Sequence, residues 1–232
     1  MPGNIRYIRR HHCGCYDGQR LKAEAEDAAT RKEWRSMAES IIRPINVGVY
    51  ATYKFGNWDR NRQPDAGSWA DAVEQYADEV EDKESNWLYL YGNYGVGKTH
   101  LAIAALRKAA AVRLWKPHIV VWPGLCALTK ESWSDKSGET EGSLWAAARN
   151  AKILLIDDID KTASSEWALG KLYTLIDYRV TRQKPTIITA NHSLEQLQRM
   201  WRIDTWQAVL SRIVGQLKMT VKMSGSDQRG HI

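Results

Sequence analysis

Gly92-Asn93-Tyr94-Gly95-Val96-Gly97-Lys98-Thr99 fits the pattern G-x-x-x-x-G-K-[ST], which is that of a phosphate-binding P-loop. The aromatic and aliphatic residues 87–91 before it are typical of a buried strand, and residues 100–106 after it are typical of a helix. This context suits the motif, because the loop's backbone N–H groups and the positive end of the helix dipole then face a polyphosphate. We therefore predict that Gly92 to Thr99, together with the adjoining His100, bind a nucleotide.

A pair of acidic residues marks a second part of the predicted site. Asp157 and Asp158 follow the continuous apolar run 153–156, which is typical of a buried parallel strand. Open α/β sheets bind their ligands at such strand ends. We expect Lys98 to reach the outer phosphates, and Thr99 and Asp157 to hold Mg²⁺. Asp158 would then orient or deprotonate the attacking water, so that Lys98 and Asp158 are predicted catalytic residues.

Two later polar residues are candidates for the same chemistry. Asn191 ends a predicted strand, residues 185–191, and its neutral side chain suits the fixing of that water or of the γ-phosphate. The alternative is an asparagine of an ordinary turn. Arg212 lies in a late, otherwise apolar helix, from which it could reach a neighbouring subunit and stabilise the charge that develops in phosphoryl transfer. The alternative for Arg212 is a surface arginine.

The order of the predicted elements indicates the fold class. Strands alternate with helices, which favours an α/β fold with three layers, αβα, around a mainly parallel sheet. Residues 217–223 alternate strictly between apolar and polar and should form an edge strand. We expect Ser68 to cap the helix that begins there, and Pro123 and Gly124 to break the second strand. The predicted strands are 87–91, 118–122, 153–156, 185–191 and 217–223, and the predicted helices are 21–42, 68–80, 100–106, two pieces within 124–150, 166–182, 194–201 and 204–214.

The bulk composition is that of an ordinary globular protein. The chain has 232 residues, of which 44% are hydrophobic, and a formal net charge of +6, which permits nucleic-acid contact without requiring it. Three cysteines make no disulfide framework, which suits a reducing cytoplasm. No apolar run has membrane-spanning length, and the first residues lack the pattern of a signal peptide. We therefore expect a cytoplasmic protein with no membrane partner.

Residues 1–48 are expected to form a small basic and helical appendage to a nucleotide-binding domain of residues 49–232. The appendage contains His11-His12-Cys13-Gly14-Cys15, and cysteine and histidine at this density can ligate zinc. Zinc sites usually combine two C-x-x-C pairs, whereas the spacing here is Cys-x-Cys and no C-x-x-C follows. A zinc site at Cys13 and Cys15, completed by the histidines or by another copy of the chain, and a reduced loop without metal both fit the sequence.

The ordered set of motifs resembles the AAA+ ATPases, and within them the DnaC/DnaI/IstB group of helicase loaders and transposition helpers. The resemblance covers about residues 50–229. It implies a AAA+ core without a separate lid domain, in which Asn191 senses the phosphate and Arg212 is an arginine finger acting in trans. It also implies that Arg229 lies near the phosphates and that residues 53–59 pack near the adenine. The matching segments are 95–102, 154–159, 184–191, 210–213 and 225–229.

The resemblance further implies a role in DNA replication. It suggests an ATP-dependent loader that places a hexameric DnaB-type helicase on single-stranded DNA, with ATP hydrolysed between the subunits of an oligomer. Lys130, Trp133 and Lys136 are candidates for contact with that strand through charge and stacking, although an ordinary solvated helix end also explains them. A transposition helper of the IstB kind shares the same site chemistry. A P-loop small-molecule kinase shares Gly92–Thr99, but it would also need an acceptor pocket and an arginine-rich lid.

Overall fold

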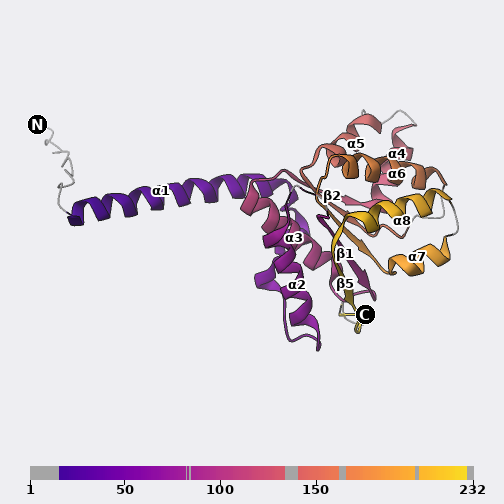
Figure 1. Ribbon diagram of the computed structural model, residues 1–232, viewed down its shortest axis with the longest axis horizontal. Coiled ribbons are helices and arrows are strands. Elements are labelled where there is room, and N and C mark those ends of the chain that lie inside the picture. The colour runs from indigo at the N-terminus through magenta and orange to yellow at the C-terminus, as the bar shows by residue number, and fades with distance from the viewer. Residues whose placement is uncertain are drawn as a thin grey trace, which may run out of the picture. The chain divides into compact units, whose positions relative to one another are not determined.

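A computed structural model gives the structure of residues 16–81, 83, 85–133, 141–161, 166–201 and 204–228, with side chains described from residue 27 onward (Figure 1). The chain divides into two compact units, Met1–Ser40 and Ile41–Ile232. None of the helices in these described ranges is long and apolar enough to cross a membrane. The division between an appendage and a nucleotide-binding domain at residue 48 stays a prediction.

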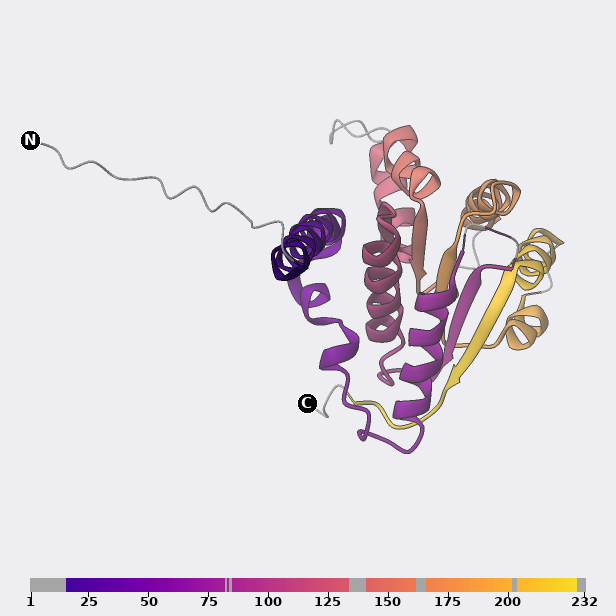
Figure 2. The same cartoon turned by 60° about the vertical axis from the view of Figure 1, so that its left-hand side comes forward.

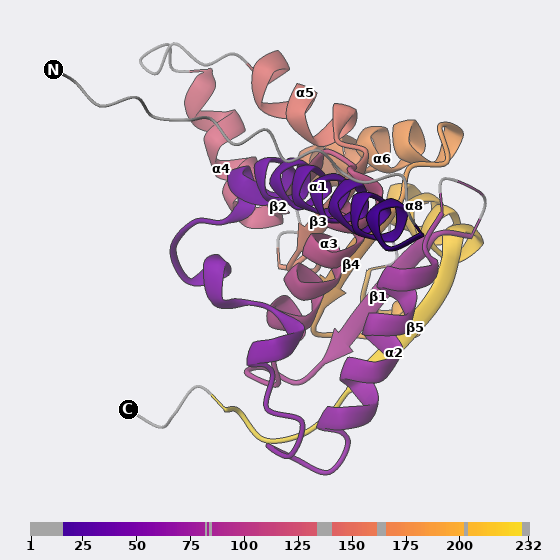
Figure 3. The same ribbon diagram turned by 90° about the vertical axis from the view of Figure 1, so that its left-hand side faces the viewer.

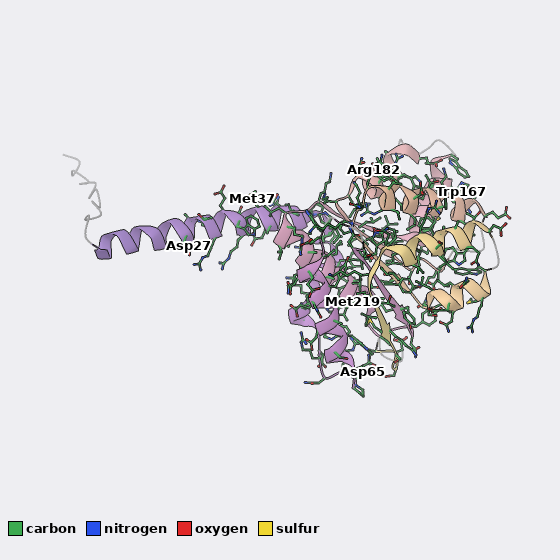
Figure 4. The ribbon with its side chains drawn as sticks, in the orientation of Figure 1. Asp27, Met37, Asp65, Trp167, Arg182 and Met219 are labelled. Atoms are coloured by element: carbon green, nitrogen blue, oxygen red, sulfur yellow. The ribbon has the colours of Figure 1, made fainter. Side chains whose placement is uncertain are left out.

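The described part of the first unit belongs to one long helix. This helix, α1, spans Tyr16–Ile42 and so begins earlier than the predicted range 21–42. Arg31 forms an ion pair with Asp27, one helical turn away. Trp34 and Met37 are exposed large apolar side chains of the same helix, and Figure 4 labels Asp27 and Met37 on it. Cys13 and Cys15 lie outside the described residues, so zinc binding there stays a prediction.

The second unit is built around a sheet of five strands in the order β2-β3-β4-β1-β5. All neighbouring strands run parallel, and Figure 3 shows them side by side in this order. Residues 217–223 form an edge strand, as the alternation predicts. The register aligns Tyr91 of β1 with Ala190 of β4, which brings their carboxyl ends to one edge of the sheet. The strands are β1 (Trp87–Gly92), β2 (Pro117–Val121), β3 (Ile153–Asp157), β4 (Thr186–Ala190) and β5 (Leu217–Met223).

Helices cover both faces of the sheet, which confirms the predicted three-layer fold (Figure 2). Alternate residues of a strand face opposite layers. Leu88 and Leu90 of β1 therefore pack with α2 (Ala66–Glu79) and α3 (Lys98–Arg113), whereas Trp87 and Tyr89 pack in the opposite layer. That layer contains α4 (Trp122–Ser132), α5 (Glu141–Asn150), α6 (Glu166–Thr181), α7 (Leu194–Met200) and α8 (Asp204–Gln216). The 3₁₀ helices η1 (Arg43–Ile45), η2 (Gly48–Thr52) and η3 (Phe55–Asn57) precede α2.

The predicted cap of α2 and the predicted end of the second strand are both wrong. Ser68 does not cap α2: Asp65 holds the cap position, and the Ser68 hydroxyl donates to the Asp65 carbonyl inside the first turn. The second strand ends at Val121, one residue before the prediction, because Trp122 already begins α4. Pro123 therefore stands in the first turn of a helix, where its missing N–H costs no hydrogen bond.

The arginine of α6, Arg179, is completely buried. Its guanidinium donates to the carbonyls of Ala148 and Ala151 (both 3.1 Å), to the carbonyl of Pro185 (2.6 Å) and to the hydroxyl of Thr186 (2.8 Å). Burial lowers the pKa of Arg179 to about 9, so the group still carries its charge at neutral pH. One side chain thus joins α6 to the end of α5 and to the start of β4.

Candidate functional site

The P-loop connects β1 to α3 and relies on glycine backbone geometry. Gly97 is the N-cap residue of α3, with φ of 97°. A Cβ atom there would lie 2.5 Å from the ring of the buried Trp58. Gly92 has φ of 139°, and a Cβ atom there would meet the Met223 carbonyl of β5. Only glycine satisfies both the left-handed backbone and the close approach at these two positions.

Lys98 is the first residue of α3, and its side chain reaches back over the loop. Its ammonium donates to the carbonyls of Gly92 (2.8 Å) and Asn93 (2.7 Å) and to Oδ1 of Asn191 (3.1 Å). All three acceptors are neutral oxygens, and burial lowers the pKa of Lys98, an effect that nearby aspartates partly offset. A buried cation that faces neutral oxygens would gain by exchanging them for phosphate oxygens, so the loop fits a polyphosphate.

Thr99 and Asp157 provide oxygens suited to a magnesium ion. The Thr99 hydroxyl lies 3.0 Å and 3.2 Å from the carboxylate oxygens of Asp157, and Thr189 donates to the same carboxylate at 2.5 Å. Burial raises the pKa of Asp157. Among the described residues, no group of three or more His, Cys, Asp or Glu side chains could hold a metal ion. A hydroxyl and one carboxylate fit Mg²⁺ in particular, because this ion usually takes its remaining ligands from water and substrate phosphates.

Asp158 turns away from the strand that precedes it. Its φ is 58°, a left-handed conformation that aspartate tolerates better than most residues, and its N–H donates to the Thr189 hydroxyl at 2.9 Å. The ammonium of Lys161 lies 2.6 Å from the Asp158 carboxylate, and this hydrogen bond raises the pKa of Lys161. Lys161 was not predicted as a site residue, since only the turn after β3 brings it beside the acid.

A cavity of about 360 Å³ brings together most of the residues predicted to bind or hydrolyse the nucleotide. It lies where the carboxyl ends of β1, β3 and β4 meet, as expected for an open parallel sheet. Asp157 does not line it directly but contacts Thr99, which does. The lining residues are Tyr53, Arg62, Tyr94, Gly95, Gly97, Lys98, Thr99, His100, Asp158, Lys161, Asn191 and Gln228.

Aromatic side chains form one wall of this cavity. Tyr53 stacks on His100 with ring centroids 4.7 Å apart, and Trp58 meets the same imidazole edge-on at 5.2 Å. His100 also contacts the Lys54 carbonyl at 3.0 Å, and burial lowers the pKa of His100, which favours its neutral form. The guanidinium of Arg62 lies 4.9 Å over the Trp58 ring. The stacked rings of Tyr53 and His100 suit the stacking of a base, and Tyr53 belongs to the predicted segment 53–59.

The segment after β5 runs along the P-loop. Asn93 donates its backbone N–H to the Met223 carbonyl (3.2 Å) and its side-chain amide to the Gly225 carbonyl (3.0 Å). The N–H of Gln228 donates to the Gly95 carbonyl at 3.2 Å. These bonds fix the outer side of the loop. Arg229, the predicted phosphate contact, lies outside the described residues, and its role stays a prediction.

Arg212 is not among the residues that line the cavity. It projects from α8 toward α6, where its Nε atom donates to Asp177 (2.8 Å) and a terminal nitrogen donates to the hydroxyl of Tyr173 (2.6 Å). The hydrogen bond to Asp177 raises the pKa of Arg212. About a third of the side chain, 31%, is exposed, so the guanidinium is held in place but open to solvent.

Of the predicted DNA contacts, Lys130 and Trp133 are described, and Lys136 lies outside the described residues. Trp133 is 57% exposed and meets Trp167 edge-to-face, with centroids 5.2 Å apart. The Lys130 ammonium lies 5.4 Å from the Trp167 ring. Figure 4 labels Trp167 at the start of α6. Trp167 was missed as a candidate because it is far from Trp133 in sequence, and only the fold joins the two rings.

Comparisons with solved structures support the fold. The crystal structure of DnaI has a TM-score of 0.61 and 22% identity, with 76% of this chain and 90% of that chain covered. The crystal structure of the DnaC helicase loader has a TM-score of 0.61 and 20% identity, with 78% of this chain and 100% of that chain covered. At these identities the likeness shows the α/β architecture alone.

Comparisons of sequence identify relatives and a family for this chain. The replicative helicase loader DnaI of Bacillus subtilis (strain 168) is 29% identical over 119 residues, which is 51% of this chain and 37% of that protein. The phage-like element PBSX protein XkdC of the same organism is 26% identical over 131 residues, 53% of this chain and 46% of that protein. The matched region is therefore less than half of either relative. The sequence pattern of the family described as "ATPase family associated with various cellular activities (AAA)" matches residues 88–209, just over half of the chain, so the chain belongs to the AAA family of ATPases.

Proposed function

We propose that the protein is an ATP-dependent loader that places a hexameric replicative helicase of the DnaB type on single-stranded DNA. The observation that carries this proposal is the sequence similarity to DnaI, whose description is that of a replicative helicase loader. The similarity covers 119 residues of this chain, and the site chemistry suits a nucleotide-driven switch. The helicase partner is proposed from the description of that relative, and the DNA strand and the oligomer are proposed from the resemblance of the ordered motifs.

Hydrolysis would use groups that already meet at the cavity. The P-loop N–H groups would hold the outer phosphates, and Lys98 would exchange its bonds to loop carbonyls for bonds to phosphate oxygens. Mg²⁺, held by Thr99 and Asp157, would neutralise phosphate charge. Asp158 would orient the attacking water and accept its proton once its carboxylate separates from Lys161. Asn191, whose Oδ1 faces Lys98, would report the presence of the γ-phosphate.

Arg212 is proposed as a finger that completes the site of a neighbouring subunit. We expect Arg212→Ala to lower the ATP hydrolysis rate at least 100-fold while nucleotide affinity changes little, because the guanidinium acts on charge that develops only in the transition state. Steady-state hydrolysis measured over a range of protein concentrations checks this. Arg199→Ala, an exposed arginine of α7, is the matched control.

Mixing two inactive variants separates action in trans from action in cis. Lys98→Ala retains Arg212, and Arg212→Ala retains an intact P-loop, so a mixed oligomer would contain some complete sites. We expect the mixture to recover part of the wild-type hydrolysis rate. Normal hydrolysis by Arg212→Ala alone at every protein concentration would show that the finger assignment is wrong.

Trp133, Trp167 and Lys130 are proposed to contact single-stranded DNA. The exposed ring of Trp133 and the half-buried ring of Trp167, beside the Lys130 ammonium, suit base stacking and backbone attraction, and each stacked base contributes about 1–3 kcal/mol. We expect the double variant Trp133→Ala/Trp167→Ala to bind a labelled oligonucleotide at least about tenfold more weakly in fluorescence anisotropy. Trp34→Ala removes an exposed tryptophan from α1 and serves as the control. Equal binding by both variants would show that Trp133 and Trp167 do not contact the DNA.

The identity of the partner protein is tested by association with the cognate replicative helicase. We expect wild-type protein with ATP to retain the helicase in a pull-down, and Lys98→Ala to retain less. Residues 1–48 are proposed as the docking segment. A chain beginning at Ile41, where the second compact unit begins, removes most of this segment and keeps the buried Ile45, so it should lose the association while it still binds nucleotide. Failure of the wild-type protein to bind the helicase, with or without ATP, would favour a transposition helper with the same ATPase chemistry.

A further inference from the structure

A buried carboxylate outside the predicted site lies directly behind Asn191. The side chain of Asp160 is 1% exposed and belongs to the turn after β3. It accepts the backbone N–H of Asn191 at 2.8 Å and the side-chain amide nitrogen of the same residue at 3.3 Å. The ring nitrogen Nδ1 of His192 lies 2.8 Å from the same carboxylate. Two consecutive residues at the tip of β4 thus converge on one acid.

These contacts fix the orientation of the Asn191 amide. An ionised carboxylate only accepts hydrogen bonds, so the NH₂ end of the amide must face Asp160 and the oxygen must point the other way. That oxygen lies 3.1 Å from the Lys98 ammonium, which only donates. A flipped amide would set oxygen against carboxylate and NH₂ against ammonium. Donor and acceptor chemistry on both sides therefore selects a single orientation of Asn191.

The surrounding turn holds Asp160 in place. The N–H of Ile159 donates to the Thr189 carbonyl at 3.1 Å, which ties the turn after β3 to β4. The Tyr89 hydroxyl donates to the His192 carbonyl at 2.7 Å, which ties the tip of β4 to β1. Because Asp160 accepts from Nδ1, that nitrogen of His192 carries a proton. Hydrogen bonds that link β3, β4 and β1 therefore hold the residues around this carboxylate.

We propose that Asp160 is a positioning residue that sets the orientation in which Asn191 meets the terminal phosphate of a bound nucleotide. This inference rests on the proposed role of Asn191 in sensing the γ-phosphate. One N–H of the Asn191 amide is bound by Asp160, which leaves the second N–H as the donor that a phosphate oxygen can accept. The backbone bond from Asn191 to the same acid keeps this donor at a fixed distance from Lys98. Asp160 itself does not line the cavity and is not proposed to touch nucleotide.

Asp160→Asn tests the assignment, because it keeps the shape of the side chain and replaces one of its two acceptor oxygens by an NH₂ donor. The probes are ADP and the non-hydrolysable ATP analogue AMPPNP, titrated separately by calorimetry. We expect the preference for AMPPNP over ADP to fall about tenfold, which is the scale of one hydrogen bond to a charged group, with little change for ADP. Glu195→Gln, an acid-to-amide change on the exposed face of α7, should leave both affinities unchanged.

A double-mutant cycle with Asn191→Ala separates positioning from a general structural effect. If Asp160 acts through Asn191, adding Asp160→Asn to Asn191→Ala causes no further loss of the AMPPNP preference. A full and additive loss in that background would overturn the proposal. Thermal unfolding of each variant identifies any loss that comes from unfolding.

Nuclear magnetic resonance of the wild-type protein without nucleotide gives a reading that needs neither activity nor a folded variant. The side-chain amide proton of Asn191 that Asp160 binds should exchange with solvent far more slowly than the amide protons of an exposed asparagine. Amide protons of Asn191 that exchange with solvent as fast as those of an exposed asparagine would overturn the positioning role even in an active ATPase. Slowly exchanging Asn191 amide protons in a protein that hydrolyses no ATP would leave the positioning role intact and refute the ATPase proposal.

Discussion

Replacing Lys98 by alanine is expected to weaken ATP binding at least 100-fold and to reduce hydrolysis to background. The variant would lose the Lys98 ammonium, which donates hydrogen bonds to the carbonyls of Gly92 and Asn93 and to the amide oxygen of Asn191. Preorganised charge in a partly water-excluded site has a large effect on phosphoryl transfer, about 10²–10³ in rate for one donor. Calorimetric titration with ATP and a phosphate-release assay measure the two effects.

Lys108 of the same helix provides the matched control. Its ammonium is paired with Glu74 (2.9 Å) and Asp78 (2.8 Å) on the surface between α2 and α3, away from the cavity. Lys108→Ala should keep ATP affinity and hydrolysis close to wild type, because its ion pairs join α2 to α3 and lie outside the cavity. If Lys98→Ala binds ATP as tightly as Lys108→Ala, the nucleotide does not occupy the P-loop.

Arg179→Met should destabilise the protein more than any surface substitution, by about 3–5 kcal/mol of unfolding free energy. Methionine fills a similar volume but donates no hydrogen bond, so the carbonyls of Ala148, Ala151 and Pro185 lose their guanidinium partner in the core. Each buried acceptor that is left without a donor costs about 1–3 kcal/mol. Lys184 also reaches the Ala151 carbonyl, at 3.4 Å, and offsets a small part of the loss.

Urea denaturation followed by circular dichroism measures this effect. Arg182→Met, three residues further along and exposed, is the matched control, and Figure 4 labels Arg182 at this surface. Its guanidinium lies 3.9 Å over the Tyr178 ring, an exposed contact that contributes about 0.5–1 kcal/mol. Equal unfolding midpoints for the two variants would contradict the account of Arg179 as the residue that fastens α5, α6 and β4 together.

The fold was largely predictable because its signals are local. The apolar runs of β1, β3 and β4 are continuous. Gly92 and Asp157 end β1 and β3, and Asn191 follows β4, so a parallel sheet must gather these residues at one edge. The strict alternation of apolar and polar residues over 217–223 was enough to predict the edge strand. Helix ends were less predictable, since Ser68 and Pro123 each satisfy more than one role in a first helical turn.

The parts that could not be predicted depend on register and on contacts between distant segments. Asp160 reads in the sequence as one more acid after a strand, and only the pairing of β3 with β4 places it behind Asn191. Arg179 falls in a helix with many charges, and no sequence pattern reveals that four acceptors surround its guanidinium. Trp133 and Trp167 belong to different helical segments that meet only in the folded chain.

Loading of the helicase onto a DNA circle tests the proposed function most directly. A circle without ends excludes threading, so unwinding of an annealed oligonucleotide requires that the hexameric helicase be opened and placed on the strand. We predict that wild-type protein with ATP increases this unwinding severalfold, whereas Lys98→Ala and Arg212→Ala do not. Equal unwinding with and without wild-type protein, in an assay where the helicase is active on linear DNA, would contradict the proposal of an ATP-dependent loader.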